Sequence, residues 1–308
     1  MGARGRRGHP QGSGPSPRLS ERQTGPPLPW TSPPHLFVLI VAFACILVSV
    51  SFRIYEYDWL EHLTVGKAIW RLGRVPRTEM WTWLDYGTPV VNPSWGFSAV
   101  LWPFWAWGGE LGLAAWRWLT TLVVFALLWR TSRVFGAREP FGLVVLVIAS
   151  LVYRQRSQVR PETLAAVLLA LELWLLAARR RRWGWHDAAL IAVVWMWANV
   201  HISWFLGVVL LALGWLAGVA RGSSRSIGHA DGLGRVAVLA GLAAFLNPFG
   251  GRAVWRPFEF ALSWRTDPLL SGISELRAID WGANLSNGLP ILLLGWPAVA
   301  LWRWRRRG

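Results

Sequence analysis

Long apolar runs, separated by short polar segments, divide most of the chain. The first run, 36–52, is long enough to span a bilayer, which takes roughly 20 residues. Further apolar stretches follow at 111–130, 140–153, 163–178, 188–200, 204–220, 236–247 and 289–302. This pattern predicts an all-α fold, a polytopic bundle of about eight transmembrane helices in a lipid bilayer.

One further stretch, 95–108, is short and mostly aromatic and contains Pro103. Such a segment either lies in the membrane interface, where tryptophan is favoured, or crosses as a ninth span. If it crossed, the arginine run 179–182 would lie outside, against the tendency of Lys and Arg to stay on the cytoplasmic side. We therefore expect eight spans with both termini in the cytoplasm, with nine spans as the alternative.

The composition agrees with a membrane protein. Only 16% of the 308 residues are charged, whereas a soluble domain has about 25%. The net charge is +16, and Lys67 is the single lysine, so the cations are almost all arginine. In a soluble protein this excess would indicate nucleic-acid binding. Here the arginines fall between apolar runs, as orientation signals do, and we expect no nucleic-acid partner.

The domain organisation follows from the same pattern. Residues 1–35 are rich in Gly, Pro, Ser and Arg and are predicted to form a disordered, basic cytoplasmic tail, while 36–308 form the transmembrane domain. Cys45, the single cysteine, excludes an intrachain disulfide and a thiolate metal site. The P-loop, zincin and α/β-hydrolase motifs are missing from the sequence. A transporter has little support, because no internal repeat is evident.

Under this topology the unusual polar residues gather on the outer face. The first outer loop, 53–110, begins with Glu56 and Asp58. Carboxylates placed beside a histidine can provide a general base, a divalent-cation site, or both. The structural alternative, which spacing alone favours, is that these acids cap a helix or pair with Arg53 and Lys67.

The residues after Asp58 have helical spacing. A helix over 58–72, lying along the membrane surface, would place Asp58, His62 and Gly66 on one face. Glycine at the last of these positions would let a ligand or another helix approach closely. The first outer loop therefore predicts interfacial helices and a candidate site.

The second outer loop, 153–162, ends in Arg160-Pro161-Glu162. Proline and an acid suit the first turn of a helix, which is a sufficient structural explanation for both. Arg160 is different, because a guanidinium outside and near the membrane is a natural ligand for a lipid phosphate.

Polar residues also occur at membrane depth. For Asn199, hydrogen bonding between helices and a role in a site are equally good interpretations, whereas His201 favours a site. Glu172, inside an apolar run, is interpreted as packing between helices or reaching the interface. The segment 247–250, Asn-Pro-Phe-Gly, is typical of a helix stop. The long loop that follows, 251–288, is predicted to cover the outer site.

These motifs together resemble a known family. An acidic pair followed by H-L-x-x-G-x-x-I-x-x-x-G-R-V-P-R-T is similar to bacterial membrane proteins of the GT-C superfamily. These are polyprenyl-phosphate-dependent glycosyltransferases, including protein O-mannosyltransferase-like and aminoarabinose-transferase-like proteins. The likeness covers roughly 37–285 and is carried by Glu56, Asp58, His62, Gly66, Gly73, Val75, Pro76, Arg160, Pro161, Glu162, Trp197, Ala198, Asn199, His201, Asn247, Pro248 and Gly250.

The resemblance implies an integral membrane glycosyltransferase of the cell envelope. It would move a sugar from a polyprenyl-phosphate donor to an extracytoplasmic acceptor at the plasma (inner) membrane. The alternative is a non-catalytic membrane scaffold or lipid-binding subunit with the same fold. The chain stops at 308, whereas relatives usually continue with more spans, so the expected alternatives are a minimal member, a fragment, or a form in which a partner subunit supplies the missing C-terminal part.

The resemblance also implies roles for individual residues. Asp58 or Glu56 is the expected catalytic carboxylate, which would take the acceptor proton or help to hold a cation. Glu56, Asp58 and Glu162 are the expected ligands of a divalent cation, Mg²⁺ or Mn²⁺ rather than Zn²⁺. The residues expected to bind substrate are His62, Arg160, Asn199 and His201.

Overall fold

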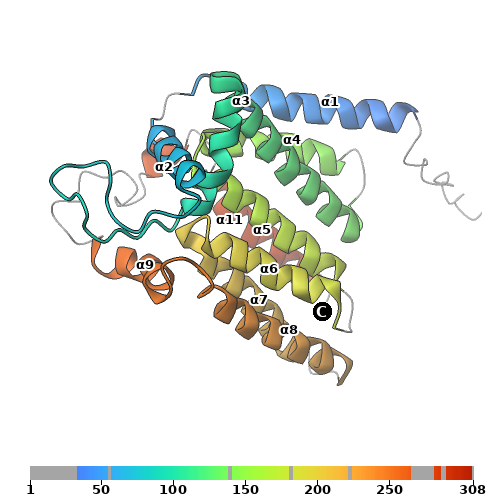
Figure 1. The fold of residues 1–308 in the computed structure, drawn as a ribbon. Coiled ribbons are helices and arrows are strands. Elements are labelled where there is room, and N and C mark those ends of the chain that lie inside the picture. Colours follow the sequence, from blue (N-terminus) through green and yellow to red (C-terminus); the bar gives the residue numbers. More distant parts are fainter. Residues whose placement is uncertain are drawn as a thin grey trace, which may run out of the picture.

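The computed structural model describes residues 33–54, 57–137, 141–179, 183–220, 224–264, 281–285 and 289–306. Within these residues the secondary structure is helical, apart from one isolated antiparallel bridge between Thr78 and Pro89 (Figure 1). The all-α prediction is therefore confirmed.

Short connections join many of the helices, whereas the longer segment 73–94 lies between α2 and α3. In chain order they are α1 (Pro33–Val50), α2 (Trp59–Leu72), α3 (Trp95–Val134), α4 (Phe141–Tyr153), η1 (Arg154–Ser157), α5 (Pro161–Ala178), α6 (Trp185–Ala198), η2 (Ile202–Trp204), α7 (Phe205–Ala220), α8 (Ser224–Ala243), α9 (Gly251–Leu262), α10 (Trp281–Leu285) and α11 (Leu289–Arg305). Of the predicted disordered tail, 1–35, residues 1–32 lie outside the described residues, and residues 33–35 belong to α1.

Four helical segments are long and apolar enough to cross a membrane, which indicates a membrane protein. They are α1, α3, α5 and the continuous segment Ile202–Ala220. The other predicted spans coincide with α4, α6, α8 and α11. Of these, α4 and α6 have 13 and 14 residues, and α8 is apolar only over Gly232–Ala243. At 1.5 Å per residue, helices of this length fall short of a hydrocarbon core about 30 Å thick. Eight or nine spans are therefore not confirmed.

The aromatic stretch 95–108 is helical, and a break at its end separates it from the helix that follows; its place in the membrane interface stays a prediction. It forms the first part of α3, a 40-residue element that also contains the predicted span 111–130. The two parts meet at Gly109, whose φ of 54° and ψ of −126° break the helix. Three residues later, a Cβ at Gly112 would lie 1.8 Å from the Phe104 carbonyl oxygen. Glycine at this position therefore allows the second part of α3 to pack closely against the first.

The bundle is built around α3, α5, α6, α7 and α8. α3 packs against α5, α6 lies between α5 and α8, and α7 packs along α8 (Figure 1). The large side chains at its centre are fully buried and include Phe97, Leu175, Trp197 and Leu211. A smaller cluster holds α1 and α4 to the second part of α3. This frame fixes where the helix ends lie, and the candidate site is formed at those ends.

Candidate functional site

The predicted helix over 58–72 is present as α2 and is fixed to α3 by a small residue. A Cβ at Gly66 would lie 2.2 Å from the Ser98 carbonyl oxygen, so this glycine allows the two helix backbones to touch. Leu63 on the same side is buried. Of the two interpretations of Gly66, the approach of another helix is the one found. α2 ends at Gly73, whose φ of 65° is left-handed, as is common where a helix stops.

Asp58 directly precedes α2, but its side chain does not cap the helix. Instead its carboxylate forms an ion pair with the guanidinium of Arg160, which directly precedes α5. The contact joins the first outer loop to a segment 102 residues further along the chain. Helix capping is therefore not the role of Asp58. Lys67, which the sequence offered as a partner, lies over the Trp102 ring instead.

His62 lies one helical turn after Asp58. Its Nδ1 is 3.0 Å from the hydroxyl oxygen of Ser98 on α3. Burial lowers the pKa of His62 to about 4, the Asp58 carboxylate opposes this shift, and Arg160 and His201 add to it. His62 is therefore neutral at physiological pH. Asp58, Arg160 and His201 are therefore close enough to His62 to act on its charge.

His201 lies at the junction between α6 and α7. Its Nδ1 accepts a hydrogen bond from the backbone N–H of Ser203 (3.2 Å) and lies 2.6 Å from the hydroxyl oxygen of that residue. Because Nδ1 accepts, the proton of the neutral ring is on Nε2. Burial lowers the pKa of His201, and the Glu162 carboxylate raises it. Glu162 lies in the first turn of α5 after Pro161, where the sequence placed both.

The structure thus brings most of the predicted site residues to one end of the bundle. They come from the start of α2, the start of α5 and the α6–α7 junction, and they are Asp58, His62, Arg160, Glu162 and His201. Glu56 lies outside the described residues. The chemical roles of these residues stay predictions.

Asn199 is held in hydrogen bonds between helices. Its amide oxygen accepts a hydrogen bond from the Trp95 indole N–H (3.0 Å), and its amide nitrogen donates to the carbonyl oxygens of Trp195 (2.8 Å) and Leu246 (3.4 Å). The side chain therefore joins α3, α6 and the segment after α8, which is the structural alternative given above. A role in substrate binding stays a prediction.

The predicted cover loop, 251–288, is helical at both of its described parts, α9 and α10, and 265–280 lies outside the described residues. The turn before α9 has the expected form, with the Asn247 side-chain oxygen accepting from the Phe249 N–H at 2.8 Å. Pro248 in this turn shares a cavity with Arg74 and Arg77 of the first outer loop. The turn that leads into the cover segment therefore borders a cavity of the first loop.

A metal centre is not formed by the described residues alone. Within them, no group of three or more His, Cys, Asp or Glu side chains is placed to hold a metal ion. Asp58 faces a guanidinium, and Glu56, a predicted ligand, is outside the described residues. Asp58 and Glu162 do not by themselves fit a divalent cation, so the cation site stays a prediction and no step below uses it.

Arg117 supports the site from within α3, and its role was not predicted from the sequence. Its side chain is buried and donates hydrogen bonds to the carbonyl oxygens of Val50 (3.1 Å) and Phe52 (2.5 Å) and to the side-chain oxygen of Gln158 (3.4 Å). It thereby fastens the start of the first outer loop to the second, which carries Arg160. An arginine inside an apolar run was the available signal, because such a charge is costly without partners.

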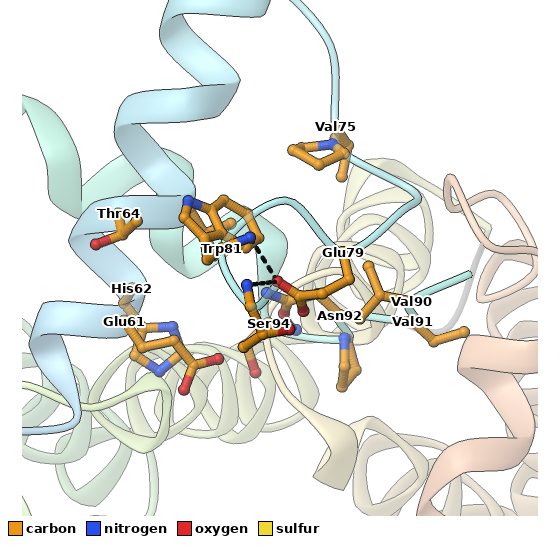
Figure 2. A pocket seen from close by; sticks show the side chains of 14 residues that line it. Glu61, His62, Thr64, Val75, Glu79, Trp81, Val90, Val91, Asn92 and Ser94 are labelled. Atoms are coloured by element: carbon orange, nitrogen blue, oxygen red, sulfur yellow. Dashed lines mark hydrogen bonds between the residues drawn. The ribbon is translucent and has the colours of Figure 1, made fainter. Parts of the chain in front are cut away.

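A cavity of about 570 Å³ adjoins this cluster, between α2 and the segment 75–94. Figure 2 shows Glu61 and His62 on one side and Glu79, Trp81 and Ser94 on the other. His62 belongs both to the cavity wall and to the surroundings of the Asp58–Arg160 pair. The acids of this cavity were not singled out from the sequence.

A comparison of the chain with models of protein families, with curated proteins and with solved structures found no match. The fold and the site together define an all-helical membrane protein with charged and polar side chains from distant segments gathered at one end of its bundle.

Proposed function

We propose that the chain is an integral membrane glycosyltransferase that moves a sugar from a polyprenyl-phosphate donor to an acceptor on the extracytoplasmic face. The observation that carries the proposal is the ion pair between Asp58 and Arg160, flanked by two half-buried histidines, His62 and His201. In this transfer a carboxylate can take the acceptor proton, a guanidinium can neutralise the leaving phosphate, and neutral imidazoles can form hydrogen bonds with substrate.

The transfer forms a bond between an acceptor oxygen and the sugar carbon and breaks the bond from that carbon to the donor phosphate. The acceptor hydroxyl loses a proton, and Asp58 is the carboxylate that takes it. The phosphate leaves with added negative charge, and Arg160 neutralises it with its planar fork of donors. His62 and His201 are neutral, so they can form hydrogen bonds with substrate and do not compete with Arg160 for the negative charge of the phosphate.

The proposed membrane arrangement has eight spans in the plasma membrane, with the N-terminus in the cytoplasm and the site outside. It is tested by reporters fused after residue 182 and at residue 158. We expect the first to be cytoplasmic and the second extracytoplasmic, because Lys and Arg favour the cytoplasmic side. The reverse result would place the Asp58–Arg160 cluster inside and contradict the proposed orientation.

The enzyme proposal is tested by Asp58→Asn, which keeps the size of the side chain and removes its charge. Loss of a positioned proton acceptor typically lowers a rate by about 10²–10⁴-fold. We expect such a loss in sugar transfer from a polyprenyl-phosphate donor, measured with purified full-length protein, at unchanged yield.

The matched control is Asp85→Asn, the same change at an exposed carboxylate of the same loop, with no expected effect. Full activity of Asp58→Asn with a reduced yield would assign a purely structural role to the ion pair.

The second candidate is a non-catalytic membrane scaffold or lipid-binding subunit. It is favoured by the position of the same ion pair, which joins the first outer loop to α5 whether or not turnover occurs. Donor lipid that binds to the wild-type protein without any transfer to acceptors would support this candidate over the enzyme.

A further inference from the structure

The cavity between α2 and segment 75–94 has an unusual charge pattern for a chain of net charge +16. Two carboxylates, those of Glu61 and Glu79, line it, and among the described residues no arginine or lysine lines it. Its volume of about 570 Å³ lies within the range of about 300–1,000 Å³ that is usual for small-molecule sites. Figure 2 shows the two carboxylates on opposite sides of this space.

The carboxylate of Glu79 has a structural role in the turn that follows it. Its Oε1 accepts hydrogen bonds from the backbone N–H groups of Trp81 (2.7 Å) and Thr82 (3.2 Å). These bonds lower the pKa of Glu79, so it stays ionised. The bonds also fix the turn that carries Trp81.

The carboxylate of Glu61 lies near two other carboxylates, those of Asp58 and Glu79. Burial raises the pKa of Glu61, and the neighbouring carboxylates of Asp58 and Glu79 raise it further. A cation in the cavity would relieve this repulsion. A metal ion is a poor candidate, because the described residues contain no group of three metal-ligating side chains.

The remaining lining residues are partly apolar and partly polar, the apolar ones being Val65, Val75, Pro76, Val90, Val91 and Pro93. Thr64, Thr82 and Ser94 contribute hydroxyl groups, and Trp81 contributes a flat apolar face. Asn92 accepts the backbone N–H of Ser94 at 2.9 Å, which leaves its amide N–H groups available as donors. Hydroxyl groups of a ligand can therefore both donate and accept in this cavity.

We propose that this cavity is the acceptor subsite and that it selects a hydroxylated ring bearing an ammonium group, with Glu61 as the counter-ion. The assignment to the acceptor rests on the proposed glycosyltransferase function, whereas the preference for a cation does not. His62 lines the cavity and also lies beside Asp58 and Arg160, so a ligand held there is next to the groups that would carry out transfer.

The test uses three probes of similar shape and different charge, namely glucosamine, glucose and glucuronate. Their binding to the purified full-length protein in nanodiscs is measured at fixed ionic strength, by saturation-transfer NMR and by tryptophan fluorescence. We expect glucosamine to bind about three- to fivefold more tightly than glucose, as for a partly exposed ion pair, and glucuronate to bind most weakly.

Glu61→Gln should bring glucosamine and glucose to within about twofold of each other, the ion pair being the source of the preference. The matched control is Glu110→Gln, the same change at an exposed glutamate of α3 outside the cavity, which should keep the wild-type preference. Equal binding of glucosamine and glucose to the wild-type protein, or a preference that survives Glu61→Gln, would overturn the proposal.

The two proposals fail in distinguishable ways. If the wild-type protein shows no sugar transfer but retains the Glu61-dependent preference, the enzyme function is wrong and the cation-selective cavity stands. If transfer occurs but the three probes bind alike, the acceptor subsite is wrong and the enzyme function stands.

Discussion

The two ends of α5 each carry an arginine paired with an aspartate, but the two ion pairs are built differently. Arg160 and Asp58, before the helix, have side chains that are 19% and 58% exposed. Arg179 and Asp187, after the helix, are 2% and 1% exposed. The second pair is buried, whereas the carboxylate of the first pair is exposed to solvent and is therefore accessible to a substrate.

The surroundings strengthen this contrast. Asp187 receives both the guanidinium of Arg179, at 2.7 and 2.8 Å, and the backbone N–H of Gly184, at 2.9 Å, so it also caps the start of α6. Asp58 makes no capping hydrogen bond and lies beside a histidine that opens into a cavity. The same pair of residue types thus stabilises the bundle at one end and is available for chemistry at the other.

The largest effect is expected when the buried ion pair between Arg179 and Asp187 is broken. Asp187→Asn removes the buried counter-charge of Arg179 and should lower the free energy of unfolding by about 3–5 kcal/mol. Thermal unfolding in detergent, followed by tryptophan fluorescence, measures the loss. Activity per folded molecule should be unchanged, and an unchanged unfolding temperature would show that the buried ion pair contributes little.

A smaller effect on the free energy of unfolding is expected from a change of pH, through His62 beside the exposed ion pair. The pKa of His62 is about 4 in the folded protein and about 6.5 when unfolded, so the unfolded chain takes up the proton first as pH falls. The contribution of neutral His62 to stability is therefore complete above pH 6.5 and is lost toward pH 4, by up to about 3 kcal/mol.

His62→Gln should flatten this pH dependence, measured as the difference in unfolding temperature between pH 7 and pH 5. Burial of His201 lowers its pKa too, so a residual slope of the same sign should remain in the variant. A variant with the full wild-type slope would contradict the burial of a neutral His62.

The smallest effect is expected from the exposed ion pair itself. A double-mutant cycle of Asp58→Asn and Arg160→Gln should give a coupling energy of about 0–1 kcal/mol for stability, because water screens the exposed carboxylate. Chemical denaturation of the four proteins measures it. A coupling of several kcal/mol would make the two ends of α5 alike and weaken the case for a substrate at Asp58.

Short-range features of this protein were determined by its sequence. The helix after Asp58, the helix start at Pro161 and Glu162, and the turn at Asn247 all appear as expected. Each depends on residues within a few positions of one another, through helical spacing, fixed proline geometry or an Asn side chain bonding its own backbone.

Other features were decided by the tertiary structure alone. The partner of Asp58 is 102 residues away, and the choice of Arg160 over Lys67 depends on how α2 and α5 are held against α3. The cavity at Glu61 lies between α2 and segment 75–94, which doubles back on itself with the Val90 N–H donating to the Arg77 carbonyl oxygen at 3.0 Å. Sequence spacing encodes neighbours along one helix, whereas ion pairs and cavities depend on which distant segments pack together, and that is settled by burial over the whole bundle.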